Sequence, residues 1–110
     1  MINPNKIFAA GYSNGGYMAY RLSCDLSDKI AAFGSVCGNM YLIDDNTDCT
    51  EQDREIPIIH IHGTLDNINP YYEGGYGLFG NDIIGDEYLT IFESIEFWSS
   101  QNQLTNESVD

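Results

Sequence analysis

Three short apolar runs along the chain predict β-strands. Residues 6–10 and 30–37 are almost continuously apolar, and residues 57–63 combine β-branched residues with a terminating glycine. Runs of this length, bounded by polar and turn residues, are typical of strands buried in a sheet. We expect a buried first strand, a second strand buried on both faces, and a third that ends at Gly63.

The segment after the first run has the spacing of an amphipathic helix. Met18, Leu22 and Leu26 recur at every fourth position, and Ala19 lies on the adjoining face. Apolar residues at this spacing form one stripe along a helix. The pattern predicts a helix over residues 15–26 that buries these side chains.

A second helix is predicted near the end of the chain. Thr90 and Glu93 form a capping-box pattern, and the helix is expected to end near Asn102. Glu93 and Glu96 are expected to face water. The face expected to be buried consists of Ile91, Ile95 and Trp98, with Phe92 beside them.

The order of these elements indicates the fold class. Strands that alternate with helices are typical of an α/β protein with a parallel sheet, here of about three strands flanked by helices. Reactive groups in such sheets gather beyond the carboxyl ends of the strands. Ser13 follows the first predicted strand and Asp66 follows the third. We therefore expect a hydroxyl and a carboxylate at one edge of the sheet.

Two connecting segments are expected to be irregular. Residues 39–55 are polar and acidic, and their aspartates lack the spacing and central glycine of a calcium-binding loop, so a solvated surface loop is predicted. Residues 71–85 are rich in glycine and aromatic residues. Tyr71, Tyr72 and Tyr76 follow Asp66 closely enough to line a substrate site, but an ordinary flexible loop is the favoured interpretation.

Composition and charge narrow the classes of partner. The chain is 43% hydrophobic, which suffices for a packed core. It carries 17 acidic and 4 basic residues, with a net charge of -13. This balance disfavours nucleic acid and anionic membrane surfaces, which both require clusters of Lys and Arg. No apolar run has the length of a membrane span and no segment resembles a signal peptide, so localisation stays open.

The three cysteines do not predict a metal centre. Cys24, Cys37 and Cys49 form no closely spaced pair, and no Cys and His spacing suits zinc. One disulfide with a free thiol is expected in an exported protein, and three reduced thiols in a cytosolic one. The count alone leaves both alternatives open.

The run Gly11-Tyr12-Ser13-Asn14-Gly15 is the strongest chemical signal. A G-x-S-x-G run between a strand and a helix is typical of a nucleophile elbow, in which the serine occupies a strained turn. Small residues on both sides are expected because a Cβ atom would clash where the strand and helix pack. The alternative is a glycine-rich turn with an ordinary surface serine.

Three blocks of sequence together resemble one group of α/β-hydrolases. They are residues 3–8, residues 11–22, and residues 57–66, which end in His-Gly-Thr-Leu-Asp. These blocks resemble the polyhydroxybutyrate depolymerase and feruloyl esterase group, and the resemblance runs from Asn3 to about Gln103. It implies a partial α/β-hydrolase fold.

The resemblance also implies roles for individual residues. Ser13 matches the nucleophile, Asp66 the acid of the catalytic triad, and the backbone amide of Asn14 one donor to the oxyanion. The implied activity is hydrolysis of small or polymeric carboxylic esters through an acyl-serine, without a metal or organic cofactor. Cys24 and Cys49 occupy positions at which this group often has cysteines, so a disulfide between them is compatible with the resemblance.

The base of the triad is the main departure. Hydrolases of this fold have the chain order serine, acid, histidine, and no histidine follows Asp66. We therefore expect residues 1–110 to be the central part of one α/β-hydrolase domain, without its upstream strands and catalytic histidine, and to hydrolyse little alone. His60 and His62 are interpreted as buried or turn-forming residues that point to opposite faces of the sheet.

Two other functions stay open from the sequence. One is a non-catalytic remnant or interaction module that retains the elbow without a base. The other is a peptidase or dienelactone-type hydrolase on the same fold. The sequence does not indicate an oligomeric state.

Overall fold

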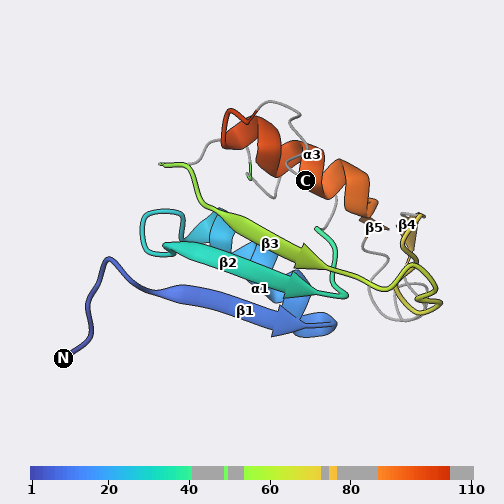
Figure 1. The fold of residues 1–110 in the computed structure, drawn as a ribbon, viewed down its shortest axis with the longest axis horizontal. Helices are drawn as coiled ribbons and strands as arrows, with labels where there is room; N and C mark the ends of the chain where they lie inside the picture. Colours follow the sequence, from blue (N-terminus) through green and yellow to red (C-terminus); the bar gives the residue numbers. More distant parts are fainter. Residues whose placement is uncertain (41–48, 50–53, 73–74, 77–86, 105–110) are drawn as a thin grey trace, which may run out of the picture.

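The computed structural model describes residues 1–40, 49, 54–72, 75–76 and 87–104 (Figure 1). Strands and helices alternate through most of this part, which confirms the predicted α/β class. The elements are β1 (Phe8–Tyr12), α1 (Asn14–Asp25), β2 (Ala32–Val36), β3 (Ile58–Ile61), β4 (Gly75–Tyr76), β5 (Glu87–Tyr88) and α3 (Ile91–Gln101).

The main sheet contains three parallel strands in the order β1-β2-β3. Tyr12 pairs with Val36, and Val36 pairs with Ile61, so the carboxyl ends of the three strands lie level with one another. The three arrows point the same way in Figure 1. The loops that leave the strands therefore meet at one edge of the sheet.

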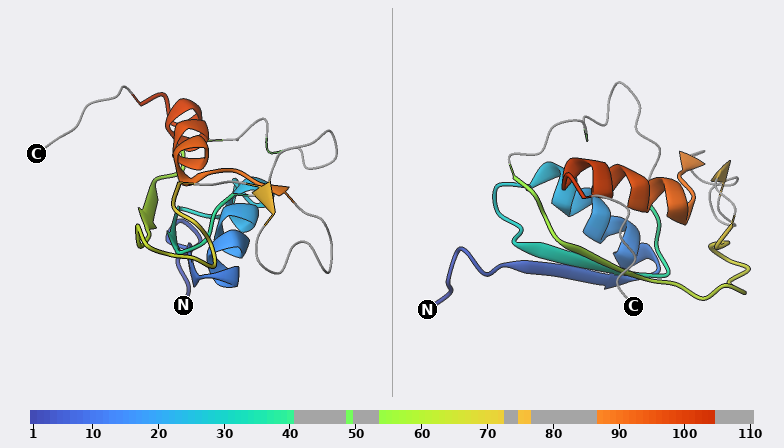
Figure 2. Two further views of the ribbon diagram at one scale, coloured as in Figure 1. Left: turned by 90° about the vertical axis from the view of Figure 1, so that its right-hand side faces the viewer. Right: turned by 45° about the horizontal axis from the view of Figure 1, so that its top comes forward.

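Helices α1 and α3 cover the same face of this sheet (Figure 2). Phe33 of β2 makes edge-to-face contacts with Tyr20 of α1, at 5.1 Å between ring centroids, and with Trp98 of α3, at 4.9 Å. Trp98 and Tyr20 are almost fully buried and form the centre of the core. The predicted burial of Trp98 in the core is therefore confirmed.

Burial of the strands is lower than the apolar runs predict. In the described residues β1 is an edge strand that alternates between exposed and half-buried positions, and β2 buries only Phe33 and Ser35. The predictions of a buried first strand and of a second strand buried on both faces were wrong for this part of the chain, because helices α1 and α3 cover one face. The other face exposes apolar side chains, among them Phe8, Tyr12, Ile59 and Ile61.

Helix α1 lies where it was predicted but buries a different face. Met18 is 54% exposed, whereas Gly16, Ala19, Tyr20 and Ser23 are buried. The reason is the close approach of α1 to the sheet: a Cβ atom on Gly16 would lie 2.5 Å from the side-chain oxygen of Ser35. A glycine is therefore needed at this point of contact, and the buried face is shifted away from Met18, whereas Leu22 and Leu26 are half-buried and Leu26 packs against the core.

The predicted cap of the second helix is confirmed. The Thr90 hydroxyl accepts a hydrogen bond from the Glu93 backbone, and the Glu93 carboxylate accepts one from the Thr90 backbone, both at 3.1 Å. Glu93 and Glu96 are exposed as predicted. Phe92 is exposed rather than packed beside Ile91, because consecutive helical residues point about 100° apart.

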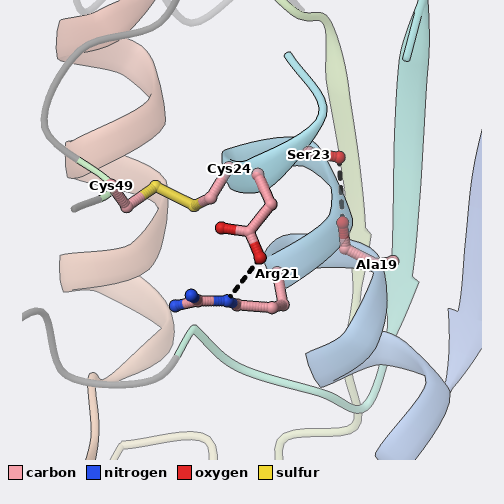
Figure 3. The surroundings of a disulfide bond; sticks show 6 residues. Ala19, Arg21, Ser23, Cys24 and Cys49 are labelled. Carbon is pink, nitrogen blue, oxygen red and sulfur yellow. Dashed lines mark hydrogen bonds and ion pairs between the residues drawn. A yellow bond between two sulfur atoms is a disulfide. The ribbon is translucent and has the colours of Figure 1, made fainter. Parts of the chain in front are cut away.

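A disulfide joins Cys24 of α1 to Cys49 (Figure 3). Their Cα atoms are 5.2 Å apart, within the usual range for such a bond. Both residues pack with the main core cluster. Cys37 is left as a free thiol.

Some predictions fall on other parts of the chain. The acidic segment with Asp44, Asp45 and Asp48 lies outside the described residues, as do most of residues 71–85 and the side chain of Tyr76. From that second segment, β4 pairs with β5, which follows it, in an antiparallel ladder. None of the helices in the described ranges has the length and apolar character that a bilayer span requires.

Candidate active site

Each strand of the main sheet is followed directly by a chemically reactive residue. Ser13 follows β1, Cys37 follows β2 and His62 follows β3. The backbone ladder continues through two of them: the Ser13 N–H donates to the Val36 carbonyl at 2.7 Å, and the Cys37 N–H donates to the Ile61 carbonyl at 2.9 Å. The parallel topology thus brings a hydroxyl, a thiol and an imidazole to one edge.

Ser13 has the strained backbone of an elbow. Its φ of 54° and ψ of -116° lie in a region that residues with a Cβ atom rarely adopt. A Cβ atom on Gly11 would overlap the carbonyl oxygen of Gly15, as expected for this turn. Gly15 was also predicted to be crowded, but a Cβ atom there would meet open space. The other glycine that packs closely against the turn is Gly38, which lies against the backbone of Ser13.

Asn14 begins helix α1 directly after the serine. The N–H groups of Gly16 and Tyr17 both donate to the Ser13 carbonyl, at 2.8 and 3.2 Å. Within the described part of the chain, the Asn14 N–H has no hydrogen-bond acceptor. It is one of the free donors at a helix N-terminus, where negative charge is favoured.

Ser13 and Asp66 share a cavity of about 350 Å³. The predicted meeting of hydroxyl and carboxylate at one edge of the sheet is therefore observed. Asn14 is not part of the cavity lining. The lining residues are Tyr12, Ser13, Cys37, Gly63, Leu65, Asp66, Ile68 and Asn69.

The carboxylate of Asp66 is held by its own loop. Its Oδ1 accepts hydrogen bonds from the backbone N–H groups of Ile68 and Asn69, both at 2.9 Å. The Asn69 bond is the largest cause that lowers the pKa of Asp66, and partial burial opposes it. The side chain is therefore an ionised hydrogen-bond acceptor, and Oδ2 lies 3.6 Å from Nε2 of His62.

His60 and His62 lie on the same side of the chain, and the prediction that they point to opposite faces was wrong. Their rings are parallel within 2°, and Nε2 of His60 lies 3.1 Å from Nδ1 of His62. Side chains alternate along a strand, so residues two positions apart share a face. Strand alternation thus places the two imidazole rings side by side.

The hydrogen bonds assign a tautomer to each ring. The Asn69 carbonyl can only accept, so Nε2 of His62 donates to it at 2.7 Å and Nδ1 accepts from Nε2 of His60. Nδ1 of His60 then accepts from the Tyr20 hydroxyl at 2.6 Å. Burial, with a smaller effect of His62, lowers the pKa of His60 to about 4. Both rings are engaged at both nitrogens, in line with their interpretation as structural residues.

Asn69 joins these groups, and the sequence did not point to it. Besides its two backbone bonds, its side-chain Nδ2 donates to the Cys37 carbonyl at 2.9 Å, and its Oδ1 accepts from the Tyr17 hydroxyl at 3.1 Å. The only available signal was its place three residues after Asp66, which suits an Asx-type turn. Asn69 thus connects the loop after β3 to the loop after β2 and to α1.

A second, larger cavity of about 740 Å³ lies beyond His62, between β3 and α3. Tyr71 contributes to its wall and makes an edge-to-face contact with His62 at 5.9 Å between ring centroids. Neither Tyr71 nor Tyr72 lines the cavity that holds Ser13 and Asp66. The alternative that tyrosines of this segment line the crevice beside Asp66 is therefore not supported for Tyr71 and Tyr72.

The parallel sheet and the strained serine turn between β1 and α1 define the class of protein as an α/β-hydrolase. Comparison with known families gives the same result: the sequence model of the phospholipase/carboxylesterase family matches residues 1–76. The chain belongs to this family. The narrower polyhydroxybutyrate depolymerase specificity stays a prediction.

Two relatives among characterised proteins carry esterase names. Feruloyl esterase B of Piromyces equi is 30% identical over 110 residues, which cover 96% of this chain and 19% of that protein. The bifunctional acetylxylan esterase/xylanase XynS20E of Neocallimastix patriciarum is 30% identical over 73 residues, which cover 66% of this chain and 10% of that protein. The chain thus spans between a tenth and a fifth of the length of these relatives.

Proposed function

We propose that the chain carries the nucleophile and the acid of a serine carboxylic-ester hydrolase. Ser13 is the nucleophile, Asp66 is the acid that orients the base, and the N–H of Asn14 is one donor to the oxyanion. The observation that carries the proposal is the cavity shared by a strained Ser13 and an ionised Asp66. Family membership supports the same chemistry.

The proposed reaction has two steps. The Ser13 oxygen attacks the ester carbonyl while a histidine takes the hydroxyl proton, and the alcohol then leaves with that proton as the acyl-serine forms. Water, activated by the same histidine, releases the acid and restores Ser13. The developing negative charge on the carbonyl oxygen is favoured at the N-terminus of α1, where the Asn14 N–H is free.

The base is proposed to come from outside residues 1–110. His60 and His62 have both ring nitrogens engaged in hydrogen bonds, and neither ring lines the cavity that holds Ser13. The relatives are five to ten times longer than the matched region, which leaves room for a histidine segment. We propose that the chain is the central part of one hydrolase domain.

Feruloyl esters are the proposed substrate class, with hydroxybutyrate polyesters as the second candidate. The match to feruloyl esterase B extends over 96% of this chain, further than the match to the acetylxylan esterase. The test is to compare the rates at which the same protein hydrolyses feruloyl, acetyl, hydroxybutyryl and peptide substrates. The preferred substrate distinguishes these ester specificities from one another and from the peptidase alternative.

Exogenous imidazole offers a direct test. Without a base the chain should hydrolyse p-nitrophenyl acetate slowly, because loss of a catalytic histidine costs about four to six orders of magnitude in rate. Added imidazole should restore a rate above its own background, with an acetyl group on Ser13 detected by mass spectrometry. Ser13→Ala and Asp66→Asn should remove this increment.

The matched control is Ser100→Ala, which replaces an exposed serine near the end of α3. It should leave the imidazole-dependent rate unchanged. A rate that is the same for the wild-type chain and Ser13→Ala at every imidazole concentration would contradict the proposal.

A further inference from the structure

Three side chains with metal-binding atoms converge beside the candidate nucleophile. One ligand atom each of Cys37, His62 and Asp66 lies within 4.8 Å of the others. Cys37 is the first residue after β2, whereas His62 and Asp66 belong to the loop after β3. No zinc-like spacing appears in the sequence because the ligands come from two separate loops.

The ligand types and one measured distance fit a tetrahedral zinc ion. Zinc binds thiolate, imidazole and carboxylate at about 2.0–2.3 Å, so two of its ligand atoms lie about 3.5 Å apart. Nε2 of His62 and Oδ2 of Asp66 are 3.6 Å apart. Oδ1 of Asp66 is already held by backbone N–H groups, which leaves Oδ2 as the ligand atom.

Cys37 can supply the thiolate. Cys24 and Cys49 are joined in a disulfide, so Cys37 is the free thiol of the chain. Its backbone is fixed by the hydrogen bond to Ile61, and its side chain is a hydrogen-bond partner of the Asp66 carboxylate. Metal binding releases the thiol proton to solvent.

His62 must present the lone pair of Nε2 to the metal, so it gives up its hydrogen bond to the Asn69 carbonyl oxygen, which then lies beside the cation. If the proton of His62 moves to Nδ1, it can donate to Nε2 of His60, which in turn carries its proton on Nδ1 beside the Tyr20 oxygen. Both rings stay neutral in this arrangement. A metal-bound histidine generally donates its second N–H to a fixed acceptor, and His60 provides one.

We propose that Cys37, His62 and Asp66 bind a divalent transition-metal cation of the zinc class, with the fourth position open to the cavity. The net charge of -13 favours the approach of cations to the chain as a whole. The metal would occupy the Asp66 oxygen that faces His62. As far as the proposed esterase function holds, the bound metal therefore inhibits it.

Cobalt titration tests the site without any assay of hydrolysis. Co²⁺ added to the chain with its disulfide intact should give a thiolate-to-cobalt charge-transfer band that saturates at one ion per chain and is displaced by Zn²⁺. Because Cys37 is the free thiol, Cys37→Ser should abolish the band. Asp66→Asn removes a direct ligand and should weaken Co²⁺ binding by more than the about 10- to 100-fold that loss of an outer-shell partner costs.

Asp28→Asn is the control, since it removes an exposed carboxylate elsewhere and should leave the titration unchanged. Circular dichroism of each variant checks that the fold persists. The absence of a charge-transfer band in the wild-type chain, or an unchanged affinity in Asp66→Asn, would overturn the three-ligand site.

Inhibition is a separate arm of the experiment. Zn²⁺ should suppress the imidazole-dependent hydrolysis by the wild-type chain but not by Cys37→Ser. A metal that binds without altering a Ser13-dependent rate would refute inhibition and leave the binding site standing. A chain that binds metal but shows no Ser13-dependent rate would refute the proposed function alone.

Discussion

The backbone N–H of Asn69 donates to Oδ1 of Asp66 at 2.9 Å, and this bond determines where the acid of the candidate site lies. The carbonyl oxygen of the same residue accepts from His62, and its side chain bonds to the Cys37 backbone and the Tyr17 hydroxyl. A single buried asparagine therefore holds the loops after β2 and β3 together. The position of the carboxylate depends on this residue as much as on its own loop.

Asn69→Ala should destabilise the protein by about 2 kcal/mol, because it removes the side-chain hydrogen bonds to Tyr17 and Cys37 in a buried setting. Asn67→Ala, at an exposed position of the same turn, should change stability by less than about 0.5 kcal/mol. Urea denaturation of both variants measures the difference. Equal midpoints for the two variants would show that the side chain of Asn69 has no structural role.

Gly11 and Gly15 form a second matched pair. Gly11→Ala should cost about 3 kcal/mol or more, because the new Cβ atom would overlap the Gly15 carbonyl, which cannot move without disrupting α1. Gly15→Ala meets nothing within 4 Å and lies in the helix, so it should stabilise by about 0.5 kcal/mol. Thermal denaturation checks the order. Comparable stability of the two variants would contradict the close packing of the elbow.

Periodicity predicted which elements exist, but not all the faces they bury. The strands and both helices lie close to their predicted ranges because the alternation of apolar runs and helical spacing is a local property. Met18 is exposed because α1 approaches the sheet at Gly16, which sets the face that the helix buries, and this contact between distant segments is not a local property. Apolar spacing alone therefore pointed to the wrong face.

The candidate site likewise combines residues that local sequence predicts with residues whose roles depend on contacts between distant segments. Ser13 and Asp66 were predictable from the elbow and from the rule that parallel strands present their carboxyl ends at one edge. Cys37 and Asn69 were not, because their contacts join loops that are separated in sequence. The pairing of His60 with His62, by contrast, follows from strand alternation alone, because residues two positions apart share a face.

His60 should make stability depend on pH. Its pKa is about 4 in the folded protein and 6.5 in the unfolded chain, so the unfolded chain binds more protons between these values. The contribution of His60 is fully present above about pH 6.5 and is lost as the pH falls toward about 4. The stability difference between the wild-type protein and His60→Phe should therefore shift in favour of the wild type as the pH rises across this window.

Urea denaturation of both proteins at several pH values measures this difference. Groups that titrate in both proteins contribute equally and cancel in the difference. Glu96 lines the same cavity as His60, and Glu96→Gln provides the control. The control should retain the pH-dependent difference that His60→Phe removes. Parallel stability curves for the wild type and His60→Phe would rule out the lowered pKa.

The disulfide should contribute substantially to stability. It joins Cys24 to Cys49 across 25 residues, and a loop of this length corresponds to about 3 kcal/mol. Reduction, or the double change Cys24→Ser and Cys49→Ser, should lower the unfolding midpoint. Cys37→Ser, which leaves the disulfide intact, should respond to reductant as the wild type does. An unfolding curve that is unaffected by reductant would exclude a stabilising bond.

The strained backbone at Ser13 should lower the stability of the folded protein. Its φ of 54° and ψ of -116° are strained for any residue with a Cβ atom and accessible to glycine. Ser13→Gly should therefore be about 1 kcal/mol more stable than Ser13→Ala, although both lack the hydroxyl. At Ser100, in α3, the same two substitutions should give the opposite order by about 0.5 kcal/mol, because glycine is unfavourable within a helix. The unfolding midpoints of the four variants test both orders of stability. If Ser13→Ala were as stable as Ser13→Gly, the turn would be unstrained in solution.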